Sequence, residues 1–213
     1  QWCFLKSDFS ILNPFPGAVA GRVAVTSGEP DIGAPPQLTF LTGNLNDDAI
    51  SYRSALMAEP QPDPGMGIGV IELAGDDALS AGNARAAVQS YRQALRIAPD
   101  DRPLWTKLTL ALLQVGTENN FERNAFARAA TSAALNAYKL TRGTSERAVS
   151  LVHLARALDW QDLYRPAIAA YTASLELENS AKVRAALEDL RARKGFRVVD
   201  HTVDSDTVSP RVC

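Results

Sequence analysis

Cysteine is scarce in this chain, which has two in 213 residues, Cys3 and Cys213. This excludes a small fold held together by several disulfides and a zinc site built from cysteines. Three arrangements stay open: a bond between the two ends, free thiols in a reducing compartment, or disulfides to segments outside this chain. We favour the third, because each cysteine lies at an extreme of the sequence and none lies between them.

Charge of one sign and long apolar runs are also lacking. Lys and Arg number 22 and Asp and Glu number 24, so the net charge of −2 provides no general attraction to nucleic acid or an anionic membrane. No apolar run approaches the roughly 20 residues of a membrane span. Protein is therefore the expected kind of partner.

Catalytic motifs are lacking as well. The chain contains no Gly-x-Ser-x-Gly, His-Glu-x-x-His or Cys-x-x-Cys. Its glycines at 65, 67 and 69 follow a proline-rich turn instead of a strand, which disfavours a phosphate-binding loop. The acidic segment around His201 lacks the glycine and the final glutamate of a calcium-binding loop. We expect a protein that is not an enzyme, with no cofactor and no metal.

Proline divides the chain, because eight of its twelve prolines precede residue 65. Residues 10–68 are predicted to form an extended N-terminal arm, a proline-rich connector interrupted by one helix over about residues 38–58. Asn44 and Asp47 are the candidate caps of that helix. Its apolar stripe follows positions i, i+4, i+7 and i+11, at Leu45, Ala49, Tyr52 and Leu56.

Residues 69–195 are almost wholly helix-forming and repeat a pattern of helix pairs. The clearest copy has a glycine turn, a small–aromatic–small helix face, a proline and a tryptophan, at Gly82, Ala87, Tyr91, Ala94, Pro99 and Trp105. Offsets of four and seven residues place the two alanines and the tyrosine on one helix face. Trp105 lies 34 residues after Ile71, which holds the same register position. The pattern therefore has a period of 34 residues.

Two further copies keep the same offsets. The middle copy follows about nine extra residues within 116–128, which either lengthen a helix or form a loop, and it has Ala130, Ala134 and Ala137. The last copy has Asp162 where glycine is usual, followed by Ala167, Tyr171 and Ser174. Residues 180–195 are predicted to form a terminal capping helix that starts at Ser180.

This order of residues resembles the tetratricopeptide repeat. The resemblance implies a mainly α fold, a short α-solenoid of helix pairs with the extended arm before it and a short β segment at the C-terminus. Such solenoids bind partners in a concave groove lined by the first helix of each pair. The groove positions hold Glu72, Asp76, Lys107, Val149 and His153. The four polar side chains are the candidate contacts, and of these only Lys107 suits an anionic peptide end.

The two ends carry a second resemblance. Residues 2–6 (WCFLK) resemble the last strand of a PAN/Apple module, which would end within residues 1–9. Residues 13–23 (NPFPGAVAGRV), the helices of 69–194 and residues 198–213 (VVDHTVDSDTVSPRVC) follow. This order is similar to the N-terminal region of large bacterial α2-macroglobulin-like proteins. Residues 196–213 would then begin the first macroglobulin β-domain.

The resemblance implies a non-catalytic helical-repeat scaffold or protein-interaction module within an extracytoplasmic protease inhibitor of the bacterial periplasm or cell envelope. Its partners would be neighbouring domains of the same polypeptide, another envelope protein or a protease. The family's trapping chemistry usually needs a Cys-x-x-Gln thioester, which these residues lack, so this chain is not the trap itself. The alternative is a free-standing tetratricopeptide adaptor that binds a peptide or protein in its concave groove.

Overall fold

The computed structural model describes residues 33–41, 44–63, 65–118 and 122–193. Within these ranges the chain forms eight α-helices and no β-strand. The helices are α1 (Leu45–Ala58), α2 (Ile68–Ser80), α3 (Ala84–Ile97), α4 (Arg102–Glu118), α5 (Arg123–Lys139), α6 (Thr144–Trp160), α7 (Tyr164–Leu177) and α8 (Ala181–Arg193). The expected PAN/Apple end, the first part of the arm, both cysteines and the expected C-terminal β segment lie outside the described residues.

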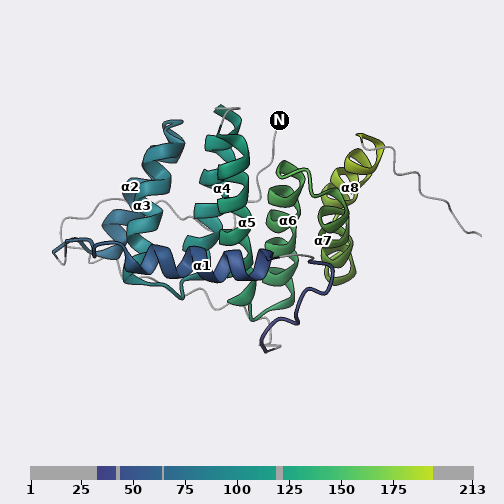
Figure 1. Cartoon of the computed structure of the whole chain (residues 1–213), viewed down its shortest axis with the longest axis horizontal. Coiled ribbons are helices and arrows are strands. Elements are labelled where there is room, and N and C mark those ends of the chain that lie inside the picture. Colours follow the sequence, from purple (N-terminus) through teal and green to yellow (C-terminus); the bar gives the residue numbers. More distant parts are fainter. Residues whose placement is uncertain (1–32, 42–43, 64, 119–121, 194–213) are drawn as a thin grey trace, which may run out of the picture.

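Helices α2 to α7 form three consecutive pairs. Each helix packs against the one before it and the one after it in the chain, because the connections at 81–83, 98–101, 140–143 and 161–163 are short. Figure 1 shows these helices side by side in a row, with α8 at the far end. We call α2, α4 and α6 the first helices of the pairs, and α3, α5 and α7 the second helices.

The turns that join α2 to α3 and α6 to α7 have the same geometry. Gly82 (φ +78°) and Asp162 (φ +61°) both adopt the left-handed backbone conformation. In each turn the amide of the next residue donates to the carbonyl five residues earlier, at 2.8 Å and 3.0 Å. The sequence places Asp162 at the glycine position of its pair, and the backbone there follows the same path as at Gly82.

The repeat faces of the second helices, which are small–aromatic–small in α3 and α7 and all alanine in α5, are buried between neighbouring helices. All nine side chains are at most 5% exposed: Ala87, Tyr91 and Ala94 on α3, Ala130, Ala134 and Ala137 on α5, and Ala167, Tyr171 and Ser174 on α7. Trp105 of α4 is fully buried, and its indole Nε1 donates to the Pro99 carbonyl at 2.8 Å. Small side chains at these positions let adjacent helices approach closely.

The middle pair is longer than the first. Both α4 and α5 have 17 residues, against 13 in α2 and 14 in α3, so extra residues extend the two helices. Residues 131–138 of α5 are all buried, around the full circumference of the helix. A helix covered on every side needs neighbours on every side.

Helix α1 supplies the missing neighbour of α5. It runs crosswise over the second helices and packs against α5 and α3 (Figure 1). Ala49 and Leu56 of its apolar stripe are fully buried, and Asn136 Nδ2 of α5 donates to the Ala49 carbonyl at 3.0 Å. The helix begins at Leu45, seven residues after the predicted start. Three apolar side chains before it pack on the core formed by α5 to α8, at Leu38, Phe40 and Leu41.

The predicted cap of α1 is not formed as expected. Asn44 is the N-cap residue, but its side chain makes no capping hydrogen bond. Its backbone carbonyl accepts a hydrogen bond from the Asp48 amide at 2.7 Å. By contrast, Asn83 caps α3 with its side chain, which accepts from the Ala86 amide at 3.1 Å.

Candidate functional site

The first helices carry the residues predicted to line the groove. Glu72 and Asp76 lie one turn apart on α2, and Lys107 reaches them from α4. Lys107 Nζ is 2.7 and 2.6 Å from the two carboxylate oxygens of Asp76 and 3.0 Å from Glu72 Oε1. The structure therefore brings three of the four predicted groove residues into one ion-pair cluster.

Tyr91 of α3 completes this cluster. Its hydroxyl donates to Asp76 Oδ1 at 2.7 Å, and Lys107 Nζ lies 5.9 Å from the centre of its ring. Burial and the hydrogen bond to Asp76 raise the pKa of Tyr91, so its phenol stays protonated at physiological pH. The sequence pattern placed Tyr91 on the small–aromatic–small face of its helix, and the structure shows that its hydroxyl also orients Asp76.

The cluster does not favour an anionic ligand. Two carboxylates already surround the Lys107 ammonium, so an incoming carboxylate would compete with Asp76 and Glu72 and be repelled by both. The cluster carries one more negative than positive charge. This part of the surface is therefore better suited to a cationic group of a partner.

His153 of α6 is not part of that cluster. No hydrogen bond or ion pair among the described residues joins it to Lys107 or to either carboxylate. Its Nδ1 is buried and has no hydrogen-bond partner among the described residues. Burial, together with Arg156 and Arg102, lowers the pKa of His153 to about 4, so the imidazole is neutral at pH 7. One turn earlier, Val149 is 45% exposed.

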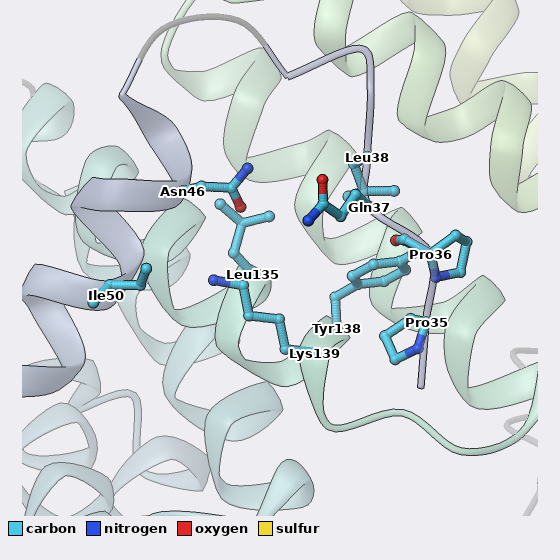
Figure 2. A pocket seen from close by; sticks show the side chains of 9 residues that line it. All are labelled: Pro35, Pro36, Gln37, Leu38, Asn46, Ile50, Leu135, Tyr138 and Lys139. Carbon is cyan, nitrogen blue, oxygen red and sulfur yellow. The ribbon is translucent and has the colours of Figure 1, made fainter. Parts of the chain in front are cut away.

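A pocket lies on the other side of the row, between α1, α5 and the segment before α1. Its volume is about 270 Å³, and it is lined by Pro35, Pro36, Gln37, Leu38, Asn46, Ile50, Leu135, Tyr138 and Lys139. Figure 2 shows Leu135 and Tyr138 of α5 between α1 and residues 35–38. The Tyr138 hydroxyl donates to the Pro36 carbonyl at 3.1 Å, which holds that segment against α5.

A second hollow of about 550 Å³ continues along α1. It shares Ile50 and Lys139 with the first pocket and is also lined by Arg53, Ser54, Met57, Ala58 and Asn136. Lys139 extends from α5 toward α1 (Figure 2). Partial burial and the nearby Arg53 lower the pKa of Lys139, and Asp47 opposes this effect.

Neither a protein-family model nor a curated protein matches the chain. Within the described ranges, no three His, Cys, Asp or Glu side chains are grouped as a metal site requires. None of the described helices has both the length and the hydropathy needed to cross a membrane.

Sequence reasoning missed the pocket, although α5 contained a signal for it. Its stretch ATSAALNAY (130–138) has small or apolar side chains on all faces, which is typical of a helix covered on every side. The stripe of α1 likewise predicts that one face is buried. Neither pattern identifies its partner, because a stripe defines a buried face and not the surface that covers it.

Proposed function

We propose that this chain is a non-catalytic helical-repeat module of the tetratricopeptide type. In this proposal it is a scaffold or protein-interaction module within an extracytoplasmic bacterial α2-macroglobulin-like protease inhibitor. The observation that carries the repeat assignment is one packing position that recurs on consecutive second helices. Ala87, Ala130 and Ala167 are each fully buried there, with a second buried side chain four residues later.

Two further features support the repeat. The turns at Gly82 and Asp162 have the same left-handed conformation and the same hydrogen bonds. Consecutive helices pack serially from α2 to α8, so most of the core is made by neighbours in the chain. A stack of this kind exposes long surfaces for its size, which suits a spacer or a docking platform.

The proposed host protein is supported by the sequence motifs at the two ends. In that setting the module would lie between a PAN/Apple module and the first macroglobulin β-domain, and Cys3 and Cys213 would form disulfides within those neighbouring domains. Protease trapping would be carried out by other parts of the polypeptide. The module would set the spacing of its neighbours or bind another envelope protein.

Peptide-mapping mass spectrometry of the protein isolated from its native cell envelope tests the host assignment. We expect peptides that continue beyond Gln1 and Cys213 into a PAN/Apple module and a macroglobulin domain. A mature product bounded by these two residues would contradict the proposal. Non-reducing maps would also show whether each cysteine is paired outside this chain.

The second candidate is a free-standing adaptor that binds a peptide along the first helices. The exposed Val149 and the net negative charge of the Lys107 cluster favour a ligand with apolar and basic side chains. Val149→Asp should weaken binding of such a peptide. The matched control is Ile97→Asp on α3, since Ile97 is 44% exposed and lies on a second helix. Equal effects of the two substitutions would show that the peptide does not bind specifically along the first helices.

A further inference from the structure

The pocket between α1, α5 and residues 35–38 has no role in the proposed scaffold, and its lining combines apolar and polar side chains. Leu135 and Tyr138 are almost fully buried and form an apolar floor. Ile50 forms one side and is 56% exposed, although it is a large apolar side chain. An exposed isoleucine beside a preformed hollow offers apolar area that a ligand can cover.

Three polar side chains line the same pocket: Gln37, Asn46 and Lys139. None of them makes a hydrogen bond or ion pair with another described residue. Figure 2 shows Gln37 and Asn46 pointing toward each other above Leu135. The pocket thus combines an apolar floor with two amide groups and one ammonium, which are hydrogen-bond donors available to a ligand.

Lys139 is the one charged side chain among the residues that line the pocket, so the lining itself favours an anionic group. Arg53 lies near Lys139 and is paired with Asp100 at 2.6 Å, so it has a carboxylate partner of its own. Asp47 is the acidic group of α1 that acts on Lys139, but it forms no ion pair with it within the described part of the chain. A carboxylate beside Lys139 would offset the repulsion from Arg53 and would accept a charge-assisted hydrogen bond.

We propose that this pocket binds a small amphipathic carboxylate, a hydrocarbon body that ends in one carboxylate. The hydrocarbon covers Leu135, Tyr138 and Ile50, and the carboxylate accepts a hydrogen bond from Lys139 Nζ. The amides of Gln37 and Asn46 are placed to donate to its second oxygen. The hollow along α1, which shares Ile50 and Lys139, accommodates a longer body.

The test uses the full chain and two probes, sodium octanoate and octanamide. Each probe is titrated into the ¹⁵N-labelled protein below its micellar concentration, and binding is measured from the NMR chemical shifts. Octanoate should give saturable shifts for residues of the pocket, and neutral octanamide should bind at least about tenfold more weakly. Lys139→Gln should lower the affinity for octanoate by a similar factor and leave the affinity for octanamide unchanged. Lys182→Gln on α8, also an exposed lysine, is the matched control and should change neither.

A second pair of variants tests the apolar contact. Ile50→Asn should weaken the binding of octanoate and of octanamide, whereas Leu73→Asn on α2, where Leu73 is 60% exposed, should change neither. Both positions are exposed, so circular dichroism should show unchanged helix content for both variants. Absence of saturable octanoate shifts, equal affinity for octanamide, or full affinity in Lys139→Gln would overturn the proposal.

Discussion

Tyr91 lies directly on Gly75, so that a Cβ atom added to the glycine would be 2.6 Å from Tyr91 Cε1. The two residues belong to the two helices of the first pair, α2 and α3. The absent side chain at Gly75 lets the tyrosine ring pack against the backbone of α2, from where its hydroxyl reaches Asp76. Close packing of the pair and orientation of the ion-pair cluster therefore depend on the same contact.

Gly75→Ala tests this contact. Alanine favours a helix over glycine by up to about 1 kcal/mol, but overpacking of a buried site typically costs about 1–3 kcal/mol. The steric term should exceed the propensity term, because the atoms in contact belong to a fully buried ring. We expect a net loss of about 1 kcal/mol or more in the free energy of unfolding, measured by urea denaturation.

The matched control is Gly69→Ala, which lies on the same helix. No atom lies within 4 Å of a Cβ built on Gly69, so only the helix propensity changes. This variant should be neutral or stabilised by up to about 1 kcal/mol. If both substitutions shift the urea midpoint in the same direction, the contact between Tyr91 and Gly75 does not determine the effect of Gly75→Ala.

Substitutions at Gly82 and Asp162, in the two equivalent turns, should have opposite effects on the free energy of unfolding. Gly82→Ala should cost about 1–2 kcal/mol, because the left-handed conformation is unfavourable for a residue with a Cβ and no steric contact contributes there. Asp162→Gly should be neutral or stabilising by up to about 1 kcal/mol, since the aspartate already bears that cost. Thermal unfolding of the two variants would show this, and a destabilised Asp162→Gly would argue against equivalence of the turns.

The ion pair between Lys107 and Asp76 should contribute measurably to stability. A double-mutant cycle of Lys107→Met and Asp76→Asn is expected to give a coupling of about 0.5–1.5 kcal/mol, because the pair is partly buried and charge-assisted. Arg128 and Asp48 form the control pair, at 3.4 Å with side chains 69% and 43% exposed. Their cycle should give a coupling of only about 0.3 kcal/mol. Equal coupling energies would show that the Lys107–Asp76 pair stabilises the fold no more than an exposed surface ion pair does.

His153 should make the fold less stable at acid pH. Its pKa is lowered from 6.5 to about 4 in the folded chain, so the unfolded chain binds the proton more readily. His153 does not lower the free energy of unfolding above about pH 6.5. As the pH falls from there toward 4, its proton uptake in the unfolded chain lowers that free energy by roughly 1–3 kcal/mol. Urea midpoints of wild type and His153→Gln between about pH 7.5 and pH 4 should differ in slope. Parallel pH profiles of the two proteins would contradict a lowered pKa of His153.

The helix pairs were predictable because each position in them is defined by local periodicity. Ala167 and Tyr171 could be aligned with Ala87 and Tyr91 through offsets along one helix, and all four are buried. The glycine position at Asp162 was equally predictable, since a helix-ending turn is a local feature. The alternatives for residues 116–128 needed the structure, in which α4 and α5 are both extended.

Long-range placement was not predictable from the same patterns. The stripe of α1 indicated a buried face, but its position across α5 depends on contacts such as Asn136 to Ala49, 87 residues apart. Of the four candidate groove residues, three meet through Lys107, while His153 makes no bond with them. Spacing in sequence places residues on a helix face, and the meeting of two faces depends on how the helices pack.

We propose that the three helix pairs are equivalent repeats of one packing unit. The most direct measurement is the unfolding free energy of three single variants, Ala87→Leu, Ala130→Leu and Ala167→Leu, with Ala185→Leu on the exposed face of α8 as control. We expect a similar loss of about 1–3 kcal/mol for each of the three variants and little change for the control. A variant among the three that is tolerated as well as the control would contradict the repeat.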